Sequence, residues 1–267
     1  MKDLKIRASS LGRLMSNDKD TSITEKQLDT LNDLLTKIKL TDKQATLRDS
    51  LMLKRDAPPE LSKGAKSYIK ELFMFHEYGV GMDIYSKYME KGVLTEDECI
   101  DLCSSLFDYG ELKKNEVELS NEYITGTPDI VNDMVLIDVK SKWSPHQCFW
   151  LAETDKEIQK NLDHKVYEWQ LKSYMWLTGH VESELVYCLV ATPEHLVLDE
   201  MRRLSWKKLE GGEVSIETEA EVRAYFDISN IPTEKRVKSF KVELTEKDVA
   251  DMKIKVNLAR KYYKQIQ

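Results

Sequence analysis

One short segment, residues 126–140 (GTPDIVNDMVLIDVK), constrains the fold more than any other part of the chain. Its apolar run 134–137 predicts a buried strand that continues through Val139. Side chains alternate between the two faces of a strand, so Asp138 and Lys140 are expected on one face and Val139 in the core. The segment therefore predicts a strand that carries a carboxylate and an ammonium side by side.

A second carboxylate, Asp129, follows another strand-like stretch, 122–125, after a turn at 126–128. We expect the two stretches to form a hairpin that brings Asp129 close to Asp138 and Lys140. Two carboxylates and a lysine suit Mg²⁺-dependent cleavage of a phosphodiester, because Mg²⁺ prefers oxygen ligands. The alternative is a solvated strand face with a minor ion pair. The apolar flanks favour the first interpretation, since an unpaired buried charge is costly.

These residues resemble the PD-(D/E)XK nuclease superfamily: Pro128-Asp129 and Asp138-Val139-Lys140 match its two central motifs. Three further stretches are similar to motifs of lambda-type, YqaJ-type and RecB-type nucleases and lie in the expected order: Ile6–Gly12, Gly92–Ile100 and Tyr167–Thr178. A D-x-K pattern alone is weak, whereas four matching stretches in the expected order, with 126–140 counted as one, are specific.

The resemblance implies roles for several residues. Asp129, Asp138 and the Val139 carbonyl would bind Mg²⁺ or Mn²⁺, and Lys140 would orient the attacking water or stabilise the transition state. Glu96 would hold a metal-bound water or a second metal. The alternative for Glu96 is an exposed glutamate in the first turn of a helix, favoured by the helix dipole.

The remaining expected site residues are polar. Gln170, expected to be catalytic, and Tyr174 are one helical turn apart and would share a face toward the site. Ser9 or Ser10 would hold the terminal 5′-phosphate of DNA, and Lys142 is a DNA-binding candidate beside the D-x-K motif. For Tyr174 and Gln170, ordinary packing at the edge of the core is the alternative.

Composition limits the other possibilities. The formal charge is −7, which favours a confined basic channel for DNA over a broad basic face. The four cysteines show no C-x₂-C pair, and none follows Cys188. We therefore expect free thiols, with neither zinc nor an iron–sulfur cluster. No apolar run is long enough to span a membrane, and the N-terminus lacks a secretory signal, which predicts a cytoplasmic protein of a bacterium or a phage-infected host.

The predicted fold class is α/β: a restriction-endonuclease-like core with a central mixed β-sheet flanked by helices, plus an added N-terminal helical region. We expect residues 1–90 to form the N-terminal region and 91–267 the nuclease core. Within them, 22–56 predicts a charged helical hairpin that serves as a packing insertion or as a clamp for a partner, and 245–265 predicts a closing helix capped by Thr245.

Other elements are expected from periodicity and caps. Helices are predicted within 60–90, from Glu96 to about 107 with Thr95 as the cap, and at 145–160 and 164–178; strands are predicted at 185–190 and 237–244.

These observations predict a Mg²⁺-dependent deoxyribonuclease, an exonuclease of the phage recombination type that acts on linear duplex ends. Its expected partners are DNA, a single-strand annealing or recombination protein and further copies of itself, without a membrane. Two alternatives stay open: an endonuclease or nickase of the same fold, and a non-catalytic DNA-binding assembly subunit.

Overall fold

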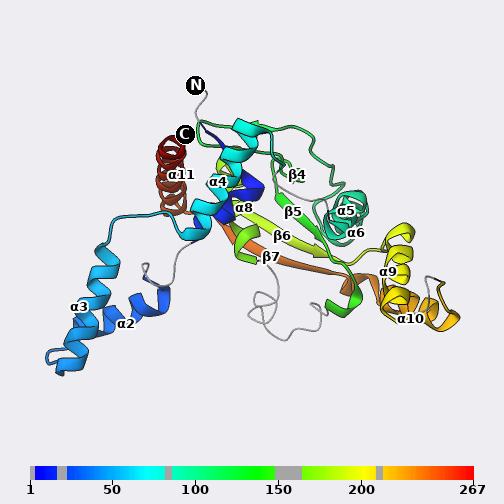
Figure 1. Ribbon diagram of the computed structural model, residues 1–267, viewed down its shortest axis with the longest axis horizontal. Coiled ribbons are helices and arrows are strands. Elements are labelled where there is room, and N and C mark those ends of the chain that lie inside the picture. The colour runs from blue at the N-terminus through cyan, green and yellow to red at the C-terminus, as the bar shows by residue number, and fades with distance from the viewer. Residues whose placement is uncertain (1–3, 17–22, 82–85, 148–163, 209–212) are drawn as a thin grey trace.

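The computed structural model describes residues 4–16, 23–81, 86–147, 164–208 and 213–267 (Figure 1). A four-stranded mixed sheet has the order β4-β5-β6-β7, in which only the β5–β6 pair is parallel. The strands are β4 (Ile130–Val131), β5 (Leu136–Ser141), β6 (Glu182–Cys188) and β7 (Val237–Glu243). The parallel pair requires a crossover, which runs through helix α8 (His164–Thr178). The sequence-predicted α/β core with a mixed sheet is thus confirmed.

Alternation along β5 and β6 sends side chains to two helical layers. On one face, Leu136 and Leu185 pack against Leu171 and Met175 of α8. On the other face, Val139, Ile137 and Val186 pack with Cys99 and Cys103 of helix α6 (Glu96–Leu106). Because the buried face of β5 toward α8 also carries Asp138, this strand places a carboxylate within a largely apolar layer.

A second, smaller sheet joins the chain's beginning to its middle. It has the order β1-β3-β2, formed by β1 (Ile6–Arg7), β2 (Leu119–Ser120) and β3 (Ile124–Gly126). Helices α1 (Ala8–Met15), α4 (Lys63–Tyr78) and α11 (Glu246–Ile266) share one apolar cluster with this sheet. Figure 1 shows α4 and α11 on this side of the molecule. The division into regions 1–90 and 91–267 stays a prediction.

The hairpin at 22–56 is helical as expected: α2 (Glu25–Thr36) and α3 (Asp42–Asp56) each begin with a capping box, from Thr24 and Thr41 respectively. Figure 1 shows the pair projecting away from the sheet. Ile38, between the two helices, is fully exposed. Thr245 caps α11 in the same way, which confirms the closing helix.

Two local predictions are wrong, and a third is confirmed only in part. Stretch 122–125 pairs with β1 and β2, so the hairpin next to the D-x-K motif is β4–β5 instead. The strand begins at Leu136 and leaves Met134 exposed, because the Asn132 side chain accepts backbone hydrogen bonds at 2.8 and 2.9 Å and turns the chain there. Thr95 is the N-cap residue of α6 as predicted, but its side chain accepts no capping hydrogen bond: its hydroxyl donates to the Lys91 carbonyl and is also hydrogen-bonded to the Ser141 hydroxyl.

Further elements are α5 (Lys87–Leu94), η1 (Pro145–Gln147), α9 (Glu194–Lys207), α10 (Ile216–Phe226) and η3 (Thr233–Lys235). Figure 1 shows α9 and α10 at one end of the molecule. The sequence did not predict α9 or α10. The helix predicted at 145–160 lies largely outside the described residues. Within the described residues, none of the helices is both long and apolar enough to cross a bilayer.

Candidate active site

Strand register brings the two aspartates together. Ile130 pairs with Ile137 across β4 and β5, and one further step along the same antiparallel register places Asp129 opposite Asp138. Asp129 Oδ2 accepts a hydrogen bond from the Val139 N–H at 2.8 Å. The N–H and C=O of one strand residue point to the same side, so the Val139 carbonyl also faces the side occupied by Asp129.

The Asp138 carboxylate is fully buried. Its Oδ1 accepts a hydrogen bond from Gln170 Nε2 at 3.0 Å. Its Oδ2 forms an ion pair with the Lys140 ammonium but accepts no hydrogen bond of good geometry within the described chain. Sequence alternation correctly placed Asp138 and Lys140 on one face of the strand.

One face of α8 covers these groups. Tyr167, Gln170 and Tyr174 follow i, i+3, i+7 spacing, which aligns them along the helix. The Lys140 ammonium lies 5.0 Å from the centre of the Tyr167 ring, and Gln170 Nε2 donates to the Tyr174 hydroxyl at 3.0 Å. The predicted shared face of Gln170 and Tyr174 is therefore present, and Tyr167 joins it.

Small residues let α8 approach so closely. A Cβ on Gly126 would lie 2.7 Å from the Tyr174 ring, and one on Gly12 would lie 2.6 Å from the Val166 backbone. No side chain fits in either place without displacing the helix. Gly126 was expected only to form a turn. Its lack of a side chain also leaves the space that the Tyr174 ring occupies.

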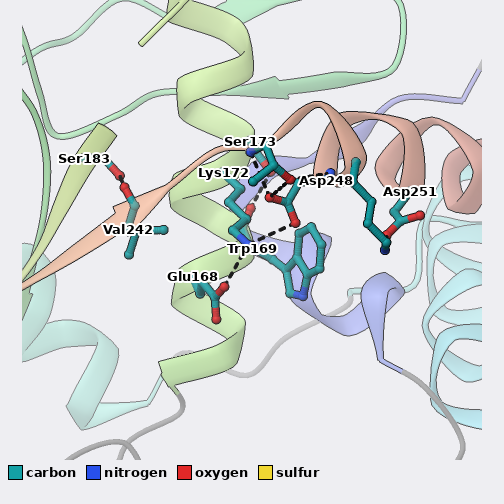
Figure 2. A network of polar contacts seen from close by, with 10 residues as sticks. Glu168, Trp169, Lys172, Ser173, Ser183, Val242, Asp248 and Asp251 are labelled. Carbon is teal, nitrogen blue, oxygen red and sulfur yellow. Dashed lines mark hydrogen bonds and ion pairs between the residues drawn. The ribbon is translucent and has the colours of Figure 1, made fainter. Parts of the chain in front are cut away.

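Opposite α8's site face, Lys172 anchors the helix to α11. Figure 2 shows its ammonium between Glu168 and Asp248, at 2.9 and 3.0 Å. Asp248 also belongs to the capping box of α11. This bridge links the orientation of Gln170 to the packing of the closing helix.

The electrostatics of the site show two carboxylates competing for one cation. Burial and the neighbouring Asp138 charge raise the pKa of Asp129 to about 7. Burial likewise raises the pKa of Asp138, although Lys140 opposes the shift. Burial would lower the pKa of Lys140, but the two carboxylates outweigh it and raise the pKa. Lys140 therefore stays positively charged at neutral pH. Its single charge does not fully compensate the two buried carboxylates, whose pKa values remain raised.

Glu96 lies at the edge of this cluster. Its charge contributes to the raised pKa of Asp138, and its carboxylate pairs with the Lys114 ammonium at 3.1 Å. Lys114 also acts electrostatically on Asp129. The neighbouring Asn115 donates to the carbonyls of Asp129 and Pro128, at 2.7 and 2.9 Å. Sequence reasoning missed Lys114 and Asn115, since they lie in an irregular segment without a pattern.

The expected DNA-binding residues are spread more widely. Ser9 is exposed, and Ser10 is half-buried. Burial raises the pKa of Tyr68, and the Ser10 hydroxyl opposes this shift. Tyr68 also lies under the Arg13 guanidinium, 4.7 Å from the ring centre. Lys142 is buried, with its ammonium 4.9 Å from the centre of the Tyr187 ring. Their roles in DNA binding stay predictions.

A buried lysine that the sequence did not single out fixes the carboxyl ends of β5 and β6. The Lys91 side chain is only 1% exposed. Its ammonium donates to the carbonyls of Lys142, Trp143 and Val190 at 2.6, 3.1 and 3.1 Å, and to the Thr192 hydroxyl at 2.9 Å. Burial lowers the pKa of Lys91 to about 8, so the group is still charged at neutral pH.

The oxygen atoms of the site supply some of the ligands that a hard divalent cation such as Mg²⁺ requires. No group of three or more His, Cys, Asp or Glu side chains is arranged to hold a metal in the chain segments that the structure describes. The Asp129–Asp138 pair, with Asp138 Oδ2 lacking a hydrogen bond, supplies two carboxylates. Mg²⁺ commonly uses one or two carboxylates and completes its shell with water and substrate phosphate. The pair therefore suits Mg²⁺ better than a closed protein cage.

No family model and no curated protein sequence matches this chain. Solved structures do. A phage-related exonuclease from Haemophilus somnus 129PT superposes with a TM-score of 0.70 and 22% identity, covering 99% of this chain and 95% of that chain. An alkaline exonuclease from Laribacter hongkongensis (LHK-Exo) superposes with a TM-score of 0.53 and 12% identity, covering 98% and 88%. Its complex with dAMP gives a TM-score of 0.50 and 14% identity, again covering 98% and 88%.

The similarities to these two exonucleases extend over nearly the whole chain. At 22% and 12% sequence identity they establish the fold alone. The fold expected from the PD-(D/E)XK resemblance is confirmed: this chain has the fold of the phage-related and alkaline exonucleases.

Proposed function

We propose that this protein is a metal-dependent deoxyribonuclease that degrades linear duplex DNA from its ends. The observation that carries the proposal is the buried Asp138, which touches Lys140 and Gln170 and lies opposite Asp129. Burying these charges costs free energy, and buried carboxylates with strongly raised pKa values are found most often at functional sites. Two structural neighbours are exonucleases, and one of them is also known in complex with dAMP, which supports the choice of DNA ends as substrate.

Each residue of the site has a proposed role. Asp129, Asp138 and the Val139 carbonyl would hold Mg²⁺ or Mn²⁺, and Glu96 would hold a metal-bound water. A bound divalent cation supplies Lewis acidity and a water of lowered pKa. The Lys140 ammonium, held charged by its carboxylates, would hydrogen-bond the attacking water or the phosphate oxygen. Gln170 and Tyr174 would keep Asp138 and Lys140 in place from α8.

The test compares linear and covalently closed circular duplex DNA of the same sequence, with Mg²⁺ and with excess chelator. We expect nucleotides to be released from the linear form alone, and only with the metal. Rapid cutting of the closed circles would support an endonuclease instead. Binding of both forms without cleavage of either, under Mg²⁺ and Mn²⁺, would support the non-catalytic assembly subunit.

A further inference from the structure

A cavity of about 710 Å³ lies beyond the carboxyl end of β5 and takes no part in the proposed chemistry. The start of α5, residues around η1, α9 and α10 enclose it. Its volume falls in the range of small-molecule and cofactor sites, roughly 300–1,000 Å³. Figure 1 shows α9 and α10 at the end of the molecule opposite α11.

Aromatic rings make up much of its wall. The Trp143 ring meets the Tyr88 and Phe226 rings edge to face, at centroid distances of 4.9 and 5.4 Å. Tyr225 meets Phe226 at 5.0 Å and stacks on the His146 ring at 4.4 Å, with an interplanar angle of 13°. Rings held in fixed orientations by one another present flat apolar surfaces to a planar ligand.

Charged groups share the same wall. The buried Glu200 pairs with Lys87 through Oε1 and with Arg203 through Oε2, the latter at 2.6 Å. The Lys87 ammonium also lies 5.1 Å from the centre of the Trp143 ring. Glu221 lines the same wall, so a phosphate would bind Lys87 or Arg203 in place of part of their bonding to Glu200. Cations beside aromatic rings suit a ligand that combines a planar base with a phosphate.

The position of the cavity ties it to the proposed active site. Trp143 follows Lys140 by three residues, so their Cα atoms are at most about 10 Å apart, the length of a few nucleotides. The Trp143 carbonyl is held by the buried Lys91 ammonium at 3.1 Å. The aromatic wall is therefore fixed relative to the strand that carries Asp138 and Lys140.

We propose that this cavity binds an unpaired nucleobase of the DNA a few nucleotides from the bond that is cleaved. The base would stack on the Tyr225 and Trp143 rings, and its phosphate would contact Lys87 or Arg203. The inference rests on the proposed nuclease function. Stacking on aromatic rings tolerates every base, so the subsite would hold the strand without selecting a sequence.

The test uses linear duplexes in which one abasic nucleotide is moved stepwise through the end, first in one strand and then in the other. A missing base removes the stacking partner and keeps the phosphates. We expect the wild-type protein to pause at one fixed offset between the abasic nucleotide and the cleaved bond, with cleavage there slowed about tenfold. Tyr225→Ala should be slowed about tenfold on intact DNA and should lose the offset-specific pause. Tyr225→Phe, which keeps the ring, should behave as wild type.

Trp206→Ala is the matched control, because Trp206 is an exposed ring on α9 outside the cavity wall. Thermal unfolding should show that Tyr225→Ala and the control are both fully folded at the assay temperature. Cleavage without an offset-specific pause, or the same pause in Tyr225→Ala, would overturn the subsite and leave the nuclease function standing. Absence of cleavage of any intact duplex by the wild-type protein would instead contradict the proposed nuclease function.

Discussion

At the scale of single residues, the site combines groups that destabilise one another. Asp129 and Asp138 face each other at the end of a hairpin, and their burial leaves them short of counter-charge even with Lys140 present. Such an arrangement is expected where a cation or substrate completes the charge balance. It has a measurable consequence for stability in the absence of metal.

The pKa of Asp129 is raised to about 7, so the folded protein retains a proton that the unfolded chain releases near pH 4. The free energy of unfolding therefore falls as the pH rises through this window, and the loss is complete above about pH 7. Asp129→Asn removes the titration. We expect this variant, without divalent cations, to be about 1–3 kcal/mol more stable than wild type at pH 8, and the gap to shrink near pH 4.

Urea unfolding at both pH values measures this difference, and added Mg²⁺ should narrow it by stabilising the wild type. Asp133→Asn is the control, since Asp133 is an exposed acid in the adjacent turn. An Asp129→Asn variant less stable than wild type by the same amount at both pH values would contradict the account of the carboxylate pair.

Alternation and helical periodicity predicted the residue contacts that run along a single element. They placed Asp138 with Lys140 on β5, and Gln170 with Tyr174 on α8. Contacts that depend on irregular chain, such as Lys114 with Glu96, follow no period and were missed. The burial of Lys142 was also not foreseen, because a single lysine after a strand gives no sign of the neighbouring Tyr187 ring.

At the scale of elements, the carboxyl ends of β5 and β6 are joined through one side chain from α5. Lys91→Met would leave the carbonyls of Lys142, Trp143 and Val190 and the Thr192 hydroxyl without this donor. We expect a loss of about 1–3 kcal/mol in the free energy of unfolding at pH 7. Cleavage should slow more than the stability loss accounts for, since β5 carries Asp138 and Lys140.

Chemical denaturation and single-turnover cleavage at a temperature where both proteins are folded measure the two effects. Lys66→Met is a matched control, because Lys66 lies exposed on α4. Unchanged stability and unchanged cleavage in Lys91→Met would show that Lys91 does not hold the strand ends.

Element identity was more predictable than element pairing. The capping boxes of Thr24, Thr41 and Thr245 mark their helices by local sequence alone. Strand pairing depends on distant partners: 122–125 pairs with β1, more than a hundred residues earlier in the chain. The sequence of a short strand does not identify the strand with which it pairs, which explains why the hairpin was assigned to the wrong strands.

At the scale of the whole molecule, the start of the chain is packed into the core instead of forming an appendage. Ile6 pairs with Ile124, and α1 packs under α8 through Gly12. This arrangement holds Ser9 and Ser10 at the beginning of α1, the helix that also carries Arg13, whose guanidinium lies over the Tyr68 ring. A DNA end bound there would meet hydroxyl groups and a guanidinium.

The combined Ser9→Ala and Ser10→Ala variant should therefore degrade 5′-phosphorylated ends more slowly, by about tenfold, while unphosphorylated ends are affected less. The measurement is nucleotide release from matched duplexes with and without the terminal phosphate. Ser105→Ala, an exposed serine near the end of α6, serves as the control. An equal loss on both kinds of end would argue against a phosphate site at the start of α1.

The most direct test of the central claim is nucleotide release from linear duplex DNA by Lys140→Ala, with Lys235→Ala as an exposed-lysine control. With Mg²⁺, Lys140→Ala should cleave at least about 100-fold more slowly than wild type while still binding DNA. The control should match wild type, and excess chelator should stop both. Cleavage by Lys140→Ala at the wild-type rate, or wild-type cleavage that continues in chelator, would contradict a metal-dependent site built on Asp129, Asp138 and Lys140.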